Sequence, residues 1–406
     1  MPDVHALLAP SAAKRWMTCT PSARLEADMP ESTSVYAKEG TFAHAIAENL
    51  LHFYKKMDCI AVYDEPTAEL VQFRAVRPEL IDIENACINE GFDFHEMLET
   101  VHNNYVRQVW DVYVRAKAED RTASLYIEQM VDLSDYVPES FGSSDAIVQW
   151  RDKLQVFDLK YGKGVRVSAK GNLQMRLYAL GALVGPCEAA PVSDITMTII
   201  QPRLRLTSSD TITARGLIDW AQNTLSIIAE QAWKGAGDFV PGQHCEFCRV
   251  KATCKALAEY TARIVNTASS AGTMTVEELA AILPKLSTIE TWIAGVKSKA
   301  MELLEQGQTV PGWKLVEGRS VRKIADEAKA RSVLSTAGFS ASDYTKTELR
   351  GITDLTKLVG GTKIFNSLLG DLVERTTGKP TLAPEDDPRA PYKSAAAAEA
   401  AFKNCV

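Results

Sequence analysis

The sequence FGSSDAIVQWRDKLQVFDLKYGKG, residues 141–164, contains two runs rich in β-branched and aromatic residues on either side of Arg-Asp-Lys. This pattern predicts a β-hairpin. If the turn is centred on Arg151 and Asp152, Asp145 lies opposite Asp158. Directly opposed side chains have Cβ atoms about 5 Å apart, and two like charges there are destabilising unless a positive group lies between them. A divalent cation is the natural occupant of that position.

Lys160 follows Asp158 by two positions, so both side chains lie on one face of a strand and the ammonium group lies beside the carboxylates. Carboxylates suit Mg²⁺ or Mn²⁺, and such an ion lowers the pKa of a bound water and neutralises charge on a phosphate. Lys160 would then orient that water or stabilise developing negative charge. A solvated hairpin face with an ordinary Asp–Lys pair is the alternative that Asp-Leu-Lys alone leaves open.

The next segment, NLQMRLYALGALVG, has the apolar spacing of a helix. Gln174 and Tyr178 are four residues apart and therefore share one face of it. Four cations, with no acidic residue among them, precede or begin this helix: Lys163, Arg166, Lys170 and Arg176. A basic stripe beside an amide and a phenol indicates a surface for a phosphate backbone. A solvated basic turn before an amphipathic helix is the alternative.

Further patterns on both sides of the hairpin define the fold class. Helical spacing without proline covers residues 40–56 and 79–118. Strand-like runs occupy SLYIEQMVDL at 124–133 and DITMTIIQPR at 194–203. The order helix, strands, helix, strand predicts an α/β fold with a mixed central sheet flanked by helices.

The chain has 406 residues, 46% of them hydrophobic and 24% charged, which suffices for a large core and a second domain. We expect one domain over residues 1–262, a mainly helical accessory domain over 263–375 and a flexible tail over 376–406. We find no apolar run long enough to cross a membrane and no secretory signal, so we expect a cytoplasmic protein without membrane association. The net charge of −7 neither requires nor excludes nucleic acid.

The cysteines suggest a second metal site. A cytoplasmic chain with eight cysteines is expected to use them as metal ligands, cluster ligands or buried thiols rather than as disulfides. Cys245, Cys248 and Cys254 in HCEFCRVKATC have the spacing C-x₂-C-x₅-C. Together with a fourth thiolate, such a set could hold a [4Fe–4S] cluster or zinc.

An ordered set of short motifs resembles the PD-(D/E)XK nucleases, in particular their RecB-like branch. The set consists of His44 in GTFAHAIAE, Asp145 in GSSDAIV, Asp158 and Lys160 in VFDLKYGKG, and Gln174 and Tyr178 in QMRLY. The chain is most similar to a phage-encoded group of this branch that combines a start like PSAAKRWMTC with DLKYGKG. The resemblance covers residues 10–255.

This resemblance assigns roles to residues. It implies that the metal ion is surrounded by His44, Asp145, Asp158 and the carbonyl group of Leu159. It implies that Lys160 assists the attacking water and that Gln174 and Tyr178 lie beside the scissile strand. Glu128, in LYIEQMV, matches an acidic residue often found on the preceding strand. Without the resemblance, a histidine such as His44 is more often simply packed on a helix.

The resemblance also supplies the fourth cysteine. RecB-like nucleases with an iron–sulfur cluster bring one ligand from before the nuclease core, and Cys19 stands there. The resemblance therefore implies a [4Fe–4S] cluster held by Cys19, Cys245, Cys248 and Cys254, with zinc as the alternative. Such a cluster would act as a staple between the two ends of the nuclease region.

The expected function is that of a phosphodiester hydrolase. We expect an exonuclease that depends on Mg²⁺ or Mn²⁺ and resects DNA ends in phage replication or recombination, in the cytoplasm of the host. Its partners would be DNA and a phage single-strand annealing or single-strand-binding protein. A site-specific or structure-specific endonuclease, and a non-catalytic nucleic-acid-binding protein with the same fold, are the alternatives.

Overall fold

The computed structural model describes residues 6–29, 35–267, 273–345, 349–384 and 390–392. The chain divides into two compact units, Met1–Ile289 and Glu290–Val406, which are described separately below.

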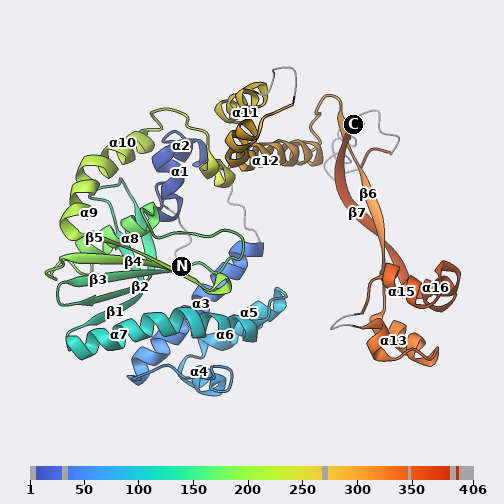
Figure 1. The fold of residues 1–406 in the computed structure, drawn as a ribbon, viewed down its shortest axis with the longest axis horizontal. Helices are drawn as coiled ribbons and strands as arrows, with labels where there is room; N and C mark the ends of the chain where they lie inside the picture. The colour runs from blue at the N-terminus through green and yellow to red at the C-terminus, as the bar shows by residue number, and fades with distance from the viewer. Residues whose placement is uncertain (1–5, 30–34, 268–272, 346–348, 385–389, 393–406) are drawn as a thin grey trace, which may run out of the picture. The chain divides into compact units, whose positions relative to one another are not determined.

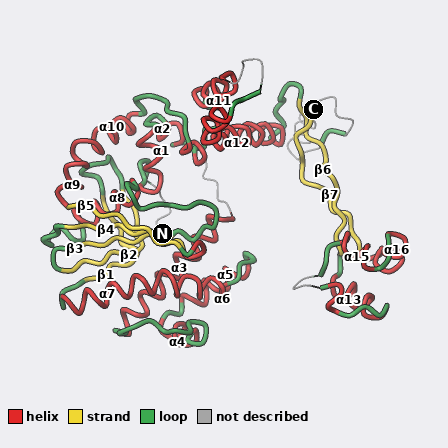
Figure 2. Tube along the Cα trace, in the orientation of Figure 1, coloured by secondary structure: helices red, strands yellow, loops and turns green. Residues whose placement is uncertain are grey.

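A five-stranded mixed sheet forms the centre of the first unit. Its strands lie in the order of the chain: β1 (Ser124–Asp132), β2 (Phe141–Trp150), β3 (Lys153–Leu159), β4 (Asp194–Gln201) and β5 (Leu206–Thr213). β3 and β4 are parallel, and the other neighbours are antiparallel. The expectation of an α/β fold with a mixed central sheet is confirmed (Figure 2).

The hairpin of β2 and β3 has the predicted register. Its pairs run from Trp150–Lys153 at the turn to Ala146–Phe157. Asp145 and Asp158 are the next residues along this register, one position beyond the last pair. They therefore lie where the two strands separate, at the end of the hairpin opposite the turn.

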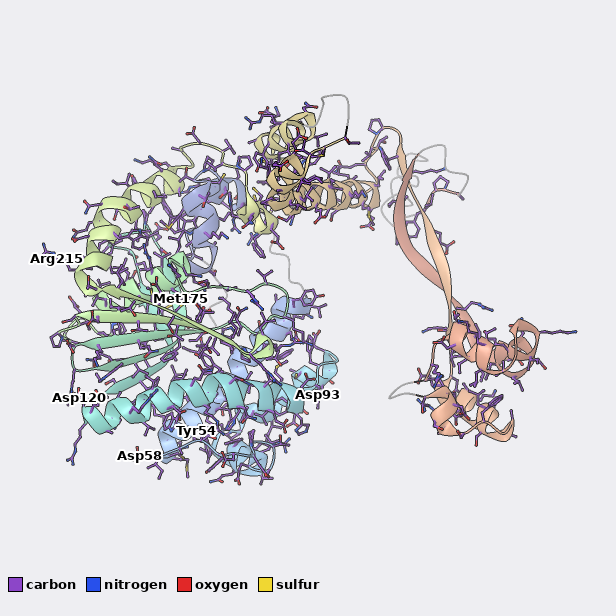
Figure 3. All side chains as sticks on the ribbon, viewed as in Figure 1. Tyr54, Asp58, Asp93, Asp120, Met175 and Arg215 are labelled. Carbon is purple, nitrogen blue, oxygen red and sulfur yellow. The ribbon has the colours of Figure 1, made fainter. Side chains whose placement is uncertain are left out.

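Helices on one side of the sheet bury the larger aromatic cluster (Figure 1). They are α3 (Val35–Met57), α4 (Leu70–Val76), α5 (Glu79–Asn89), α6 (Phe94–Val101), the π-helical turn η2 (His102–Val106) and α7 (Arg107–Glu119). Tyr54, labelled in Figure 3, lies in this core with its hydroxyl 2.7 Å from His102 Nε2. The helix predicted over 79–118 is interrupted between α5 and α6, because Gly91 has a φ of 82° and Asp93 caps the next helix.

The other face of the sheet is covered by α8 (Leu173–Val184), which Asn172 caps by accepting from the Met175 amide. A second apolar cluster fills this interface, and Met175 of α8, labelled in Figure 3, is fully buried in it. The elements that complete this side and its extensions are η1 (Pro10–Ala12), α1 (Ala13–Thr18), α2 (Ser22–Glu26), α9 (Ala214–Trp220), η4 (Ala221–Leu225), α10 (Ser226–Lys234), η5 (Gln243–Phe247) and α11 (Lys255–Thr267). The short turn η3 (Pro202–Leu204) instead contacts α6 and, through Arg203, α3.

Gly181 of α8 lets the helix lie directly on β1. A Cβ atom at this position would be 2.7 Å from Val131 Cβ. We expect Gly181→Ala to lower the free energy of unfolding by about 1–3 kcal/mol, as overpacking does, measured by urea denaturation. Gly40→Ala on α3 is the matched control, since no atom lies within 4 Å of its added Cβ. The control should be neutral or slightly stabilising; equal stability of both variants would contradict the packing described.

The second unit contains a two-stranded antiparallel sheet of β6 (Trp313–Ile324) and β7 (Val373–Pro384). The segment between these strands forms α13 (Glu327–Thr336), α14 (Ala341–Tyr344), α15 (Ile352–Leu358), α16 (Thr362–Leu369) and η6 (Gly370–Leu372), which share a small apolar core. The flexible tail predicted from residue 376 is wrong up to Pro384, because residues 376–384 pair with β6. The remainder of that predicted tail lies largely outside the described residues.

Helix α12 (Val276–Glu305) crosses the boundary between the two units. Among the described helices, it is the one that is long and apolar enough, by length and composition alone, to span a membrane. The expectation that no apolar run reaches this length is therefore corrected. Core helices of soluble proteins meet the same criterion, and α12 contains Pro284.

Candidate active site and cysteine pocket

Three potential metal ligands converge from three elements of the first unit. His44 comes from α3, Glu128 from β1 and Asp145 from β2, and one ligand atom of each lies within 4.8 Å of the others. His44 Nδ1 is 3.3 Å from Asp145 Oδ1 and 3.9 Å from Glu128 Oε1. The sequence placed Glu128 only on the preceding strand; the fold makes it part of the compact group.

The backbone of β1 turns Glu128 toward this group. The pairs Ile127–Ala146 and Gln129–Ser144 flank it, so Glu128 faces Asp145 without a shift of register. Its φ is 46°, a left-handed conformation that costs a non-glycine residue on the order of 1–3 kcal/mol. Ser143 Oγ donates a 2.8 Å hydrogen bond to Glu128 Oε2. Strain at this position is therefore offset locally, as is common where a side chain has a functional role.

Asp145 occupies the gap where β2 and β3 separate. Its Oδ2 accepts a 2.6 Å hydrogen bond from the Leu159 amide, in a place where a ladder bond would otherwise form. Asp145 is therefore held by the backbone of β3 on one side and by His44 on the other. The sequence pointed to the carbonyl group of Leu159; the contact that the structure gives Leu159 in the site is made by its amide.

Asp158, Lys160, Gln174 and Tyr178 form a connected polar chain. Lys160 Nζ donates to Asp158 Oδ1 at 3.1 Å and to Gln174 Oε1 at 3.0 Å. Gln174 Nε2 lies 3.3 Å from Asp158 Oδ1 and 3.2 Å from the Tyr178 hydroxyl, and donates to both. The predicted proximity of Lys160 to the carboxylates and the shared face of Gln174 and Tyr178 are both confirmed. Asp158 itself lies outside the compact group of three.

The charges in the site are only partly balanced within the protein. Burial opposes protonation of His44, yet Asp145 and Glu128 outweigh it and raise the pKa of His44 to about 10. Burial would raise the pKa of Asp145, but His44 and the Leu159 amide lower it. The pKa of Asp158 is raised by burial and by Asp145, although Lys160 opposes the shift. Protonated His44 and Lys160 face three carboxylates, and a divalent ion that takes His44 as a ligand would displace the proton from its ring.

A cleft of about 320 Å³ exposes these groups together. Its lining includes His44, Glu128, Asp145, Asp158 and Lys160. Asp158 is 2% exposed, and its Oδ2 forms an ion pair with Lys160 Nζ at 2.9 Å. A histidine and three carboxylates in one cleft form a donor set that fits a divalent ion of the Mg²⁺ or Mn²⁺ class.

The cleft also has a wall that the sequence did not predict. Ala6, Ala9, Pro10 and Ser11, from the N-terminal segment, line it together with the carboxylates. The sequence PSAAKRWMTC belongs to this segment. Trp16 is buried and donates to the Ala9 carbonyl at 3.0 Å within the segment. Ser140 Oγ, just before β2, donates to the Leu8 carbonyl at 2.8 Å and so holds the segment beside the sheet.

The four cations of the predicted basic stripe differ in their exposure. Lys163, Arg166 and Lys170 are exposed in the loop that precedes α8. Arg176 is instead half-buried, with its guanidinium 5.4 Å from the centre of the Trp220 ring. Three of the four cations therefore remain available to a phosphate backbone.

The four cysteines singled out from the sequence line one pocket. Cys19 ends α1, Cys245 lies in η5, Cys248 follows it, and Cys254 precedes α11. Among the residues that the structure describes, no three of these sulfurs are within 4.8 Å of one another, so they form no compact ligand group. Burial raises the pKa of both the Cys245 and Cys248 thiols.

Contacts around this pocket join distant parts of the chain. Arg15 forms an ion pair with Glu26 at 2.7 Å and donates to the Phe247 carbonyl at 3.0 Å. Glu26 in turn accepts from the Arg249 amide at 2.9 Å. These protein contacts hold the N-terminal helices against the cysteine-rich segment.

A family model described as "Protein of unknown function (DUF2800)" matches residues 5–390. The match includes the cleft, the cysteine pocket and nearly all of the second unit.

Proposed function

We propose that this chain, which belongs to the DUF2800 family, is a divalent-metal-dependent deoxyribonuclease with a PD-(D/E)XK core, and that it acts as an exonuclease. The observation that carries the proposal is the convergence of His44, Glu128 and Asp145 in one cleft with Asp158 and Lys160. The exposed cations Lys163, Arg166 and Lys170 support DNA as the substrate, because phosphate contacts supply most of the non-specific affinity for it.

Different residues of the cleft would have different roles in the reaction. His44, Glu128, Asp145 and Asp158 would hold the metal ion, which supplies an activated water and neutralises charge on the scissile phosphate. Lys160 is fixed by Asp158 and Gln174, so its ammonium group can stabilise negative charge that develops on the phosphate. Gln174 and Tyr178 hold Lys160 and Asp158 in place and present an amide and a hydroxyl to the DNA strand.

We further propose that Cys19, Cys245, Cys248 and Cys254 hold a [4Fe–4S] cluster. The four cysteines share one pocket and supply the four thiolates that either a [4Fe–4S] cluster or a zinc ion takes. The resemblance to RecB-like nucleases with an iron–sulfur cluster favours the cluster over zinc.

The exonuclease proposal predicts that cleavage depends on a DNA end. Linear DNA incubated with the purified protein and Mg²⁺ or Mn²⁺ should be degraded to short products, while covalently closed circles survive. Activity should fall steeply as salt is raised from about 50 to 200 mM, because phosphate contacts are screened. Gel analysis of both substrates in parallel makes the comparison. Conversion of closed circles to discrete fragments would instead support a site-specific or structure-specific endonuclease.

A further inference from the structure

One large aromatic side chain in the cleft beside the carboxylates is not part of a described hydrophobic core. Phe141, the first residue of β2, lines the cleft and is half-buried. Among the described residues, it belongs to none of the three hydrophobic clusters and makes no ring contact with another aromatic side chain. An aromatic ring left at a cleft in this way is available to a ligand.

Phe141 lies in the same cleft as the candidate metal ligands. Ser143, Asp145 and Glu128 line this cleft together with Phe141. Ser143 contacts Glu128, and Asp145 contacts His44. Phe141 is four residues from Asp145, about 14 Å along a strand. The ring therefore lies beside the reacting centre rather than in it.

The N-terminal segment packs against β2 next to Phe141. Gly142 follows Phe141, and a Cβ atom on it would be 3.0 Å from Pro10 Cγ and 3.1 Å from Tyr178. The missing side chain at Gly142 therefore leaves room for Pro10 and Tyr178 against the strand. Ala6, Ala9 and Pro10 also line the cleft as an apolar wall, and their side chains offer no hydrogen-bonding group.

The polar side chains of the cleft are engaged with one another, apart from the exposed Ser11. The relevant pairs are His44 with Asp145, Ser143 with Glu128, Lys160 with Asp158 and Gln174, Gln174 with Tyr178, and Thr41 with the Ala37 carbonyl. Reading the edge of a base requires free donors and acceptors. These engaged side chains are therefore not free to read a base edge, and the apolar wall remains for the base.

We propose that Phe141 stacks on a base of the substrate strand a short distance from the scissile phosphate, and that the cleft accepts any base there. This inference rests on the proposed nuclease function and adds how the substrate is held. The cleft, at about 320 Å³, is at the lower end of the range for small-molecule sites, a size that suits one nucleotide. Stacking on an aromatic ring contributes about 1–3 kcal/mol per base and tolerates all four bases.

The test uses single-stranded oligonucleotides in which 2-aminopurine, a base whose fluorescence is quenched by stacking, is placed at successive positions from the end. The full-length Asp158→Ala protein is used as background so that the DNA is bound and not cut. At one position near the end, binding should quench the fluorescence. Phe141→Leu and Phe141→Ile should abolish this quenching and weaken binding about tenfold, as measured by anisotropy. Phe141→Trp should preserve both.

Trp313→Leu is the matched control, because Trp313 is an aromatic residue of the second unit that is 44% exposed and outside the cleft. It should leave the quenching unchanged. Melting curves of all variants separate loss of fold from loss of stacking. Quenching that persists in a folded Phe141→Leu protein would overturn this inference and leave the nuclease proposal intact. Absence of DNA binding and of cleavage in the unaltered protein with Mn²⁺ would instead refute the proposed function.

Discussion

Replacing Asp145 by asparagine is expected to reduce DNA cleavage by about a thousandfold, or on the order of 4 kcal/mol of transition-state stabilisation. The reason is that Asp145 is the carboxylate shared by the compact ligand group and by the backbone of β3. Asparagine keeps an oxygen that can accept from the Leu159 amide, so the separation of β2 and β3 should be preserved. The amide lacks the negative charge that attracts a divalent ion.

The control for this variant is Asp152→Asn. Asp152 lies in the turn at the other end of the same hairpin, is exposed, and provides only its backbone carbonyl to hydrogen bonds in the structure. Initial rates on linear DNA, together with melting curves, should show a folded but inactive Asp145→Asn protein and an unaffected control. Near-normal rates for Asp145→Asn would show that the group around His44 is not the catalytic centre.

Serine at Cys19 is expected to give colourless protein with a melting temperature lower by about 10 °C or more. A cluster that joins Cys19 to Cys245, Cys248 and Cys254 closes a loop of more than two hundred residues, and closing long loops restricts the unfolded chain. A loss of several kcal/mol corresponds to a shift of this size for a unit of this length. Protein purified without oxygen should contain about four irons per chain before the substitution.

Cys59→Ser is the matched control for the cluster. Cys59 is also partly exposed, lies in the first unit and is absent from the cysteine pocket. Its replacement should leave the colour, the iron content and the melting temperature unchanged. If anaerobically prepared protein contained stoichiometric zinc and no iron, the four cysteines would form a zinc site and not a cluster site. Full colour and stability in the Cys19 variant would remove Cys19 from the site.

The hairpin and its carboxylates could be predicted from the sequence because their signals are local. Alternating apolar residues around a short turn determine the register, and the register places Asp145 and Asp158 next to each other. The shared face of Gln174 and Tyr178 follows from the helical repeat in the same way. Such features depend on residues close together in the chain.

Other features depend on contacts that the sequence does not encode locally. Strand β5, LTSSDTIT, consists mainly of serine, threonine and aspartate, with Leu206 and Ile212 as its large apolar residues, so its strand signal is weak. It forms because β4 is available to pair with it. The N-terminal wall of the cleft depends on the close approach of Pro10 to Gly142, more than one hundred residues away. Strand β7 follows from its pairing with β6 across a helical insertion.

The position of Glu128 in the compact group also could not be predicted from local sequence patterns. Its direction depends on a left-handed backbone at one strand position, and glutamate gives no sequence signal for that conformation. A histidine on a helix and an acid on a strand meet only when the sheet and α3 pack together. The compact group could therefore be recognised from the fold and not from spacing.

The most direct test of the central claim is the metal dependence of cleavage. End-labelled linear DNA is incubated with purified protein in Mg²⁺, in Mn²⁺ and in excess EDTA, with the Asp145→Asn protein purified in parallel. The unaltered protein should release short labelled products with either metal and none with EDTA, and the Asp145→Asn protein should release almost none. Intact DNA under every condition, or equal cleavage by both proteins in preparations free of host nucleases, would contradict it.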